Sequence, residues 1–246
     1  MMRKINPVLV ITILLIVISS CSYSSPQTGD LTRQDTNVPA QDWQDEFNLA
    51  GRKLSDSGEA KYFILTPGFQ TILATDKAKL IITVLDETKL INGINTRVIE
   101  EREEKNGELA EISRNFYAID QETGDAFYFG EEVDFYENNQ ISGHKGEWLA
   151  YENQNKPGLI MPGIPLVGMK YYQELAPGAA MDRAEVMSIS ETFTTPAGEF
   201  ENCLITKESS KLEPVTERKT YCPGIGLVQD QSLLLTSYGY IEETSP

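Results

Sequence analysis

The sequence predicts a mainly β fold: a single antiparallel meander sheet or half-barrel, with a short N-terminal helix and a Pro/Gly-rich crossing loop. From Tyr62 onward, β-branched and aromatic residues gather in short runs that turn residues separate. Asn92-Gly93 and Asn106-Gly107 are strong hairpin signals, because both residues of such a turn must accept positive φ. Apart from Cys21, next to the N-terminal leader, the only cysteines are Cys203 and Cys222, which fall on strands predicted to be neighbours.

Residues 1–20 have the composition of a signal peptide. Arg3 and Lys4 precede an apolar run from Val8 to Ile18, and small residues follow it before Cys21. A helix over that run would be roughly 16 Å long, whereas the hydrocarbon core of a bilayer is roughly 30 Å thick. The leader is therefore predicted to direct export rather than to span the membrane.

The tetrapeptide Ile18-Ser19-Ser20-Cys21 resembles the bacterial lipobox. The resemblance implies that Cys21 carries acyl chains such as palmitate and anchors the mature protein, since two or more chains give stable membrane attachment. The alternative is a plain secretory signal with a chance cysteine. Ser22, in place of Asp, is similar to lipoproteins sent to an outer membrane. The predicted location is the cell envelope, on the outer membrane facing the periplasm if the organism has two membranes.

The chain after the leader divides into two parts. Residues 21–42 are polar, lack an apolar period and are predicted to form a disordered tether; residues 43–246 are predicted to form the β domain. Trp43, Phe47 and Ala50 share one helical face, which predicts a short helix over residues 42–53.

The charge of the chain excludes some partners. The formal net charge is −16, and removal of the leader lowers it to −18. Such a surface repels phosphate backbones, so nucleic acid is not expected as a partner. The balance suits basic partners or divalent cations without identifying either.

The strands are predicted in chain order. A two-residue turn at Asn106-Gly107 places Lys105 opposite Glu108 and Arg102 opposite Glu111. Prolines and glycines between Pro157 and Gly178 predict the crossing loop, with one short strand in residues 168–175. The predicted strand segments are 62–65, 79–85, 89–91, 94–105, 108–120, 126–130, 133–136, 184–194 and the strands of 191–230.

The central hairpin of residues 191–230 can be aligned by its cysteines. Folding it about Leu212-Glu213 places Cys203 opposite Cys222, but this register also opposes Lys207 to Arg218 and Glu208 to Glu217, which is unfavourable. A slip of one residue removes the clash and turns the cysteines to opposite faces. We predict the disulfide, stabilising by roughly 3 kcal/mol, with residues 209–214 as a wider loop that relaxes the clash.

Known catalytic and metal-binding motifs are absent from the sequence, which predicts neither an enzyme nor a resident metal or cofactor. His144 is the only histidine and lies between glycines in a polar loop, where an exposed role outweighs a catalytic one. Residues Glu100–Glu104 alternate between the two faces of a strand. They are therefore interpreted as a solvated hairpin rather than as a calcium site or a glycosidase pair.

An apolar stretch from Leu159 to Met169 has two interpretations. The favoured one is a lid packed over one end of the β core. The other is the lining or gate of a site for an apolar ligand, since methionine adapts to ligand shape. The candidate lining residues are Trp148, Met161, Ile164, Leu166, Val167 and Met169.

Several motifs together resemble a family of uncharacterised exported bacterial proteins and lipoproteins over about residues 60–230. The motifs are Thr96–Glu103, Tyr128-Phe129-Gly130-Glu131, Pro157–Pro162, Tyr172-Gln173-Glu174 and the C-terminal Tyr221-Cys222-Pro223-Gly224-Ile225-Gly226-Leu227-Val228. The resemblance implies an envelope protein and carries no catalytic residue across.

Three functions follow in order of preference: a non-enzymatic envelope protein of structural or binding type, a carrier or sensor of an apolar ligand in a half-barrel, and a carboxylate-dependent hydrolase. The expected partners are the membrane, through the lipid anchor, and an apolar ligand or another envelope protein. An apolar cavity favours the carrier, two converging buried carboxylates favour the hydrolase, and a filled core favours the first.

Overall fold

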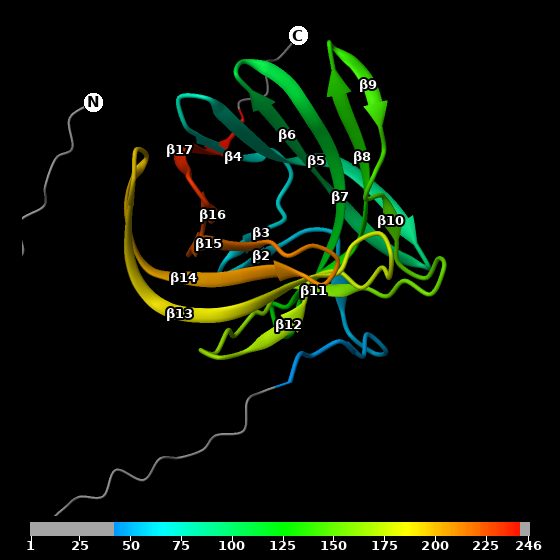
Figure 1. The fold of residues 1–246 in the computed structure, drawn as a ribbon. Helices are drawn as coiled ribbons and strands as arrows, with labels where there is room; N and C mark the ends of the chain where they lie inside the picture. Colours follow the sequence, from blue (N-terminus) through cyan, green and yellow to red (C-terminus); the bar gives the residue numbers. More distant parts are fainter. Residues whose placement is uncertain (1–41, 242–246) are drawn as a thin grey trace, which may run out of the picture. The chain divides into compact units, whose positions relative to one another are not determined.

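Long antiparallel strands account for most of the chain (Figure 1). The computed structural model describes residues 42–241, and this part of the chain contains no helix. No element of it could therefore cross a membrane as a helix. Asn92-Gly93 and Asn106-Gly107 adopt positive φ throughout and join consecutive antiparallel strands. The two hairpins predicted from these dipeptides are confirmed.

The strands are β1 (Leu54–Ser55), β2 (Glu59–Ala60), β3 (Phe63–Ile64), β4 (Phe69–Ala74), β5 (Ala78–Ile91), β6 (Ile94–Lys105), β7 (Glu108–Asp120), β8 (Ala126–Glu137), β9 (Gln140–Gly143), β10 (Trp148–Leu149), β11 (Gly158–Met161), β12 (Lys170–Tyr172), β13 (Asp182–Thr195), β14 (Gly198–Ser210), β15 (Thr216–Cys222), β16 (Gly226–Asp230) and β17 (Leu233–Tyr240).

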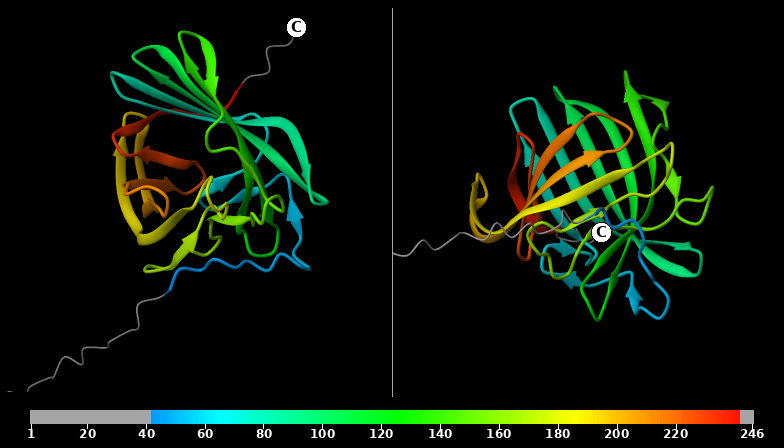
Figure 2. Two further views of the ribbon diagram at one scale, coloured as in Figure 1. Left: turned by 45° about the vertical axis from the view of Figure 1, so that its right-hand side comes forward. Right: turned by 60° about the horizontal axis from the view of Figure 1, so that its bottom comes forward.

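Two meanders form one curved sheet (Figure 2). The first meander is β4 to β8 and the second is β13 to β17. They join where β4 pairs with β17, so the order is β10-β8-β7-β6-β5-β4-β17-β16-β15-β14-β13-β12, and the sheet does not close. The predicted mainly β, antiparallel fold is confirmed. The predicted lipid anchor at Cys21, the signal peptide and almost all of the tether lie outside the described residues.

The segment from β9 to β12 connects the two meanders. Its strands β10 and β11 pair with β8, whereas β12 pairs with β13, so the segment runs between the two outer edges of the sheet. At Gly158 an added Cβ would lie 2.0 Å from the carbonyl oxygen of Gln173, so only glycine allows this close approach. The strand β12 lies within the range predicted for one short strand, and β10 and β11 were not predicted.

The main apolar core packs this connecting segment against both meanders. Its members include Phe127 of β8, Tyr171 of β12 and Leu204 of β14, all fully buried. A smaller cluster surrounds the two cysteines.

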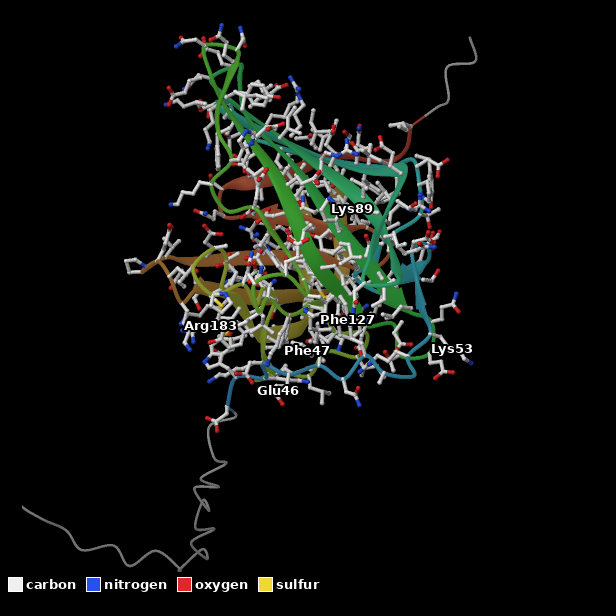
Figure 3. The ribbon with its side chains drawn as sticks, turned by 90° about the vertical axis from the view of Figure 1, so that its right-hand side faces the viewer. Glu46, Phe47, Lys53, Lys89, Phe127 and Arg183 are labelled. Carbon is white, nitrogen blue, oxygen red and sulfur yellow. A yellow bond between two sulfur atoms is a disulfide. The ribbon has the colours of Figure 1, made fainter. Side chains whose placement is uncertain are left out.

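The helix predicted over residues 42–53 is wrong. Gln44 instead pairs in parallel with Tyr171, and Trp43 packs edge-on against Tyr172. Phe47 packs edge-on against Phe127 (Figure 3). A helix this short is marginal without tertiary support. Although the aromatic residues have helical spacing, the segment is therefore extended, and each ring packs at a separate site.

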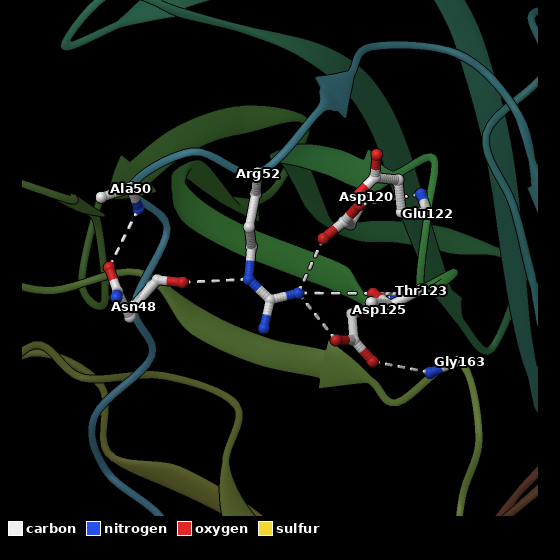
Figure 4. A network of polar contacts seen from close by, with 8 residues as sticks. All are labelled: Asn48, Ala50, Arg52, Asp120, Glu122, Thr123, Asp125 and Gly163. Atoms are coloured by element: carbon white, nitrogen blue, oxygen red, sulfur yellow. Dashed lines mark hydrogen bonds and ion pairs between the residues drawn. The ribbon is translucent and has the colours of Figure 1, made fainter.

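A polar network fastens this N-terminal segment to the first meander (Figure 4). One guanidinium nitrogen of Arg52 lies 2.8 Å from a carboxylate oxygen of Asp120 and 2.9 Å from one of Asp125. Asp125 in turn accepts a hydrogen bond of 3.0 Å from the backbone of Gly163. The network thus holds together the segment around Arg52, the β7–β8 turn and the connecting segment.

The disulfide between Cys203 and Cys222 is present. The strands adopt the register that opposes Lys207 to Arg218 and Glu208 to Glu217. The predicted wider loop is present but shifted by one residue to 210–215, because pairing continues to Ser209, opposite Thr216. The expectation that the loop relaxes the clash is wrong, since the like-charge pairs remain in register. Glu208 and Glu217 both line a cavity on the concave side of the sheet, and the Glu208 carboxylate is stabilised there by hydrogen bonds that Thr206 and Tyr221 donate to it.

Loss of this disulfide should destabilise the domain by about 3 kcal/mol, since the bridge joins residues 19 apart in sequence and restricts the unfolded chain. The Cys203→Ala/Cys222→Ala double variant and the oxidised parent are to be compared by urea unfolding. Reduction of the parent should produce the same loss. Two reactive thiols in the oxidised, unfolded parent would contradict the assignment.

Candidate functional site

The concave side of the sheet holds a cavity of about 830 Å³ that is partly open to solvent. Both meanders and the connecting segment contribute to its lining. Three lysines, Lys105, Lys145 and Lys219, face ten carboxylates there. The carboxylates are those of Glu101, Glu103, Glu111, Glu131, Glu174, Asp182, Glu208, Glu213, Glu217 and Asp230.

The first meander supplies its carboxylates from rows of paired residues. Alternate residues of a strand face the same side, so every second residue of β6, β7 and β8 faces the cavity. The rows on this face, read from β6 to β8, are Ile99–Asn115–Glu131, Glu101–Ser113–Val133 and Glu103–Glu111–Phe135.

A β-bulge places Glu111 in this set. Glu104 pairs with Leu109, but Glu103 pairs with Glu111, so Ala110 has no partner on β6. The predicted pairing of Lys105 with Glu108 is confirmed, and that of Arg102 with Glu111 is wrong. The extra residue reverses the face on which later residues of β7 lie relative to a regular hairpin. Glu111 therefore faces the cavity beside Glu103.

The second meander contributes an ion-pair cluster. The ammonium of Lys219 lies 3.4 Å from a Glu208 oxygen and 3.7 Å from an Asp230 oxygen. Burial lowers the pKa of Lys219, but the neighbouring carboxylates, Glu208 first, outweigh burial and raise it well above its ordinary value. Lys219 therefore remains charged and pairs with both carboxylates, so its one positive charge is shared between Glu208 and Asp230.

The carboxylates of the first meander and of Glu174 differ from this cluster. Glu103 pairs with Lys105 at 3.2 Å. Within the described part of the chain, Glu101, Glu111, Glu131 and Glu174 lie within 4 Å of no basic group. These four are referred to below as the unpaired carboxylates.

Burial is the main reason that the pKa values of the unpaired carboxylates rise, and mutual repulsion adds to it. The pKa of Glu101 rises to about 7 and that of Glu131 to about 8. The pKa of Glu174 rises well above its ordinary value, through burial and then through Glu131 and Asp182. Acidic groups from both meanders and the connecting segment thus raise one another's pKa values, in agreement with their common place in the cavity lining.

Tyrosines lie beside these carboxylates. Tyr117 and Tyr128 stack with their ring centroids 4.6 Å apart, and the Tyr128 hydroxyl donates a hydrogen bond to Asn115. Both rings line the cavity, as do aliphatic side chains such as Ile82 and Val84. The cavity therefore combines acidic, aromatic and aliphatic surfaces.

The connecting segment positions Glu174. The backbone nitrogens of Gln173 and Glu174 both donate to the carbonyl oxygen of Asp182, at 2.8 and 3.1 Å. On the other side, Gln173 packs against Gly158. Glu174 is thus held between the edges of the two meanders.

None of the six residues suggested for an apolar ligand lines this cavity. Trp148 and Met161 are buried in the core, and Met169 packs against it. Ile164, Leu166 and Val167 are exposed on a loop. His144 is also exposed, with its Nδ1 2.9 Å from the Val133 carbonyl oxygen and 3.0 Å from Asp134.

Sequence reasoning missed the unpaired carboxylates. The alternation of Glu100–Glu104 correctly divides them between two faces, and Arg102 and Glu104 do form an ion pair of 3.2 Å away from the cavity lining. The error was to treat both faces as solvated. No sequence pattern indicates that Glu131 and Glu174 line the same cavity, since the path of the connecting segment brings them together.

Metal binding has no geometric support in the part of the chain described, where no three histidine, cysteine or acidic side chains are grouped to hold an ion. The carboxylates are spread over the lining instead of surrounding one point.

Comparisons with known proteins give only weak likenesses. No family model and no curated protein matches the chain. A candidate lipoprotein from Parabacteroides distasonis ATCC 8503 is similar in structure at 13% identity, with 75% of this chain and 100% of that one covered and a TM-score of 0.35. A candidate exported protein with a YmcC-like fold from Bacteroides fragilis NCTC 9343 is similar at 17% identity, with 73% and 99% covered and a TM-score of 0.32.

Likenesses this weak carry no argument about function. The interpretation of the site therefore depends on its own geometry, and the resemblance of the sequence motifs to an exported family stays a prediction.

The free energy of unfolding of the protein without added ligand should fall as the pH rises from about 5 to 8. An unfolded chain releases the Glu131 proton near 4.5, whereas the folded protein keeps it until about 8. The folded state binds more protons in this window, so rising pH favours unfolding. Glu131→Gln should raise the free energy of unfolding at pH 8 by on the order of 1 to 2 kcal/mol and flatten the profile.

Denaturant unfolding at several pH values measures this effect. Glu137→Gln, at an exposed position of the same strand, is the matched control and should leave the profile unchanged. An equal pH dependence in Glu131→Gln and the parent would contradict the assignment.

Proposed function

We propose that the protein is an exported, membrane-anchored binding protein that takes a small organic cation into its concave cavity. The observation that supports this proposal is the group of unpaired carboxylates converging on one cavity. Ionised carboxylates in a partly dry site are costly unless a positive charge accompanies them. A bound cation would supply the charge that the described residues do not.

The composition of the lining defines the ligand further. A divalent metal ion requires six to eight oxygens around one point, which the spread of the carboxylates does not offer. Each ammonium group of an amine can pair with a single carboxylate, so an amine suits carboxylates that are spread over the lining. Tyr117 and Tyr128 provide aromatic surface for the cation, and the aliphatic residues provide contact for a hydrocarbon portion. The proposed ligand class is therefore an amine or diamine with an aliphatic body.

Binding of such a ligand is linked to protons. At neutral pH, Glu131 is largely protonated in the ligand-free site, because its pKa is raised to about 8, and burial raises the pKa of Glu174 in the same direction. An approaching ammonium stabilises the ionised forms, so the carboxylates release protons as the cation binds. Affinity should consequently rise with pH from about 6 to 9.

Calorimetry of the full chain with 1,8-diaminooctane tests the proposal. We expect saturable binding that strengthens between pH 6 and 9, with heats that depend on the ionisation enthalpy of the buffer because protons are released. Octanoate has the same carbon chain and the opposite charge, and should not bind. Glu174→Gln should weaken diamine binding about tenfold, which corresponds to one lost ion pair.

Glu137→Gln is the control and should bind the diamine like the parent. Absence of saturable diamine binding at pH 9 would refute a cation site. Octanoate binding as tight as that of the diamine would favour the alternative of an apolar-ligand carrier.

A hydrolase is the second candidate, because burial and Glu131 raise the pKa of Glu174, while burial and Glu101 raise that of Glu131 to about 8. Such a pair can divide the roles of acid and base between two carboxylates. The binding proposal expects no turnover of chromogenic glycosides by the full chain. If turnover is observed, is lost in both Glu131→Gln and Glu174→Gln, and is kept in Glu137→Gln, the binding proposal is rejected in favour of a hydrolase.

A further inference from the structure

An exposed apolar loop stands out on the acidic domain. Ile164, Leu166 and Val167 are 77%, 62% and 62% exposed. The thirteen residues Pro157–Met169 contain no charged side chain, although 24% of the whole chain is charged. Single exposed apolar residues are ordinary, but three at the tip of one uncharged loop indicate a surface that another apolar phase covers.

Both ends of the loop are fixed to the domain. At its start, the backbone of Gly163 donates to Asp125, and an added Cβ would lie 2.0 Å from the Thr123 carbonyl oxygen. At its end, the backbone nitrogen of Gly168 donates to Val186 at 2.8 Å, and Val186 donates back to Met169 at 2.9 Å. The tip therefore projects from anchored ends and does not pack into the core.

The loop lies beside the point where the described chain begins. Gln44 pairs in parallel with Tyr171, and its backbone nitrogen donates to Lys170 at 3.0 Å. In a parallel pair, residues before Gln44 lie alongside residues before Tyr171, which is the side of Gly168 and the loop. The described chain thus begins, at Asp42, next to the apolar tip.

Basic and aromatic side chains surround this point. The guanidinium of Arg183 lies 4.4 Å from the centroid of the Trp43 ring, and the ammonium of Lys211 lies 5.8 Å from that of Tyr172. Lys170 is also near Trp43 but pairs with Glu185 at 3.5 Å. Aromatic and basic residues of this kind gather where proteins meet the lipid head groups.

We infer that the loop tip, residues 164–167, enters the head-group layer of the bilayer to which the N-terminus is attached, with Trp43, Arg183 and Lys211 at the lipid surface. The acidic remainder of the domain is repelled by anionic lipid, which favours this face toward the membrane. The inference depends on the predicted export and anchoring, and it is independent of the ligand proposed for the cavity.

The test places an environment-sensitive fluorophore on the tip. Leu166→Cys is labelled in the full chain and incorporated into vesicles of phosphatidylethanolamine and phosphatidylglycerol. Ile141→Cys is the matched control, because it replaces an exposed aliphatic residue on β9, which Figure 1 places away from β12. The chain without an added cysteine gives the labelling background, and Val167→Cys repeats the measurement at a second tip position.

The expected result is a blue shift at position 166, loss of quenching by aqueous iodide and gain of quenching by a doxyl group on the lipid acyl chain. Position 141 should show the opposite pattern. Equal iodide quenching at 166 and 141 would overturn the inference. Protection at 166 that grows with the protein-to-lipid ratio, without doxyl quenching, would also overturn it, since a second copy of the chain would then cover the tip.

Discussion

The pairing of β4 with β17 is the contact on which the rest of the structure depends. It joins a strand near the start of the domain to its last strand, through register pairs that run from Ala74–Leu234 to Phe69–Tyr240. Without it, the two meanders would be separate sheets, and the cavity between them would have no continuous wall. Contacts this distant in sequence carry a large loop-closure cost, so we expect them to form late in folding.

Local chemistry explains which parts of the fold could be predicted. Asn-Gly dipeptides specify their turns because few other residues accept the required φ. The cysteine pair specifies the register of the β14–β15 hairpin. The N-terminal helix failed because the helical spacing of Trp43 and Phe47 also fits an extended chain whose rings find separate partners. Spacing alone does not say whether such partners exist.

The candidate site was harder to predict, because its members are brought together by long-range pairing. Glu101 and Glu103 are local neighbours, but whether their face meets bulk water or a partly covered cavity depends on strands more than one hundred residues away. The like-charge opposition of Glu208 and Glu217 appeared to argue against the observed register. It is tolerated since Lys219 pairs with Glu208 within the cavity. Local rules are broken here, at the place where function is proposed.

The bulge at Ala110 has an evolutionary consequence. Because one residue of β7 is already absorbed without a partner on β6, the hairpin tip can gain or lose a residue there while the pairing of Glu103 with Glu111 is kept. Insertions and deletions at the tip therefore do not change which carboxylates of β6 and β7 face the cavity. A change in the length of this hairpin tip should accordingly leave the acidity of the cavity unaltered.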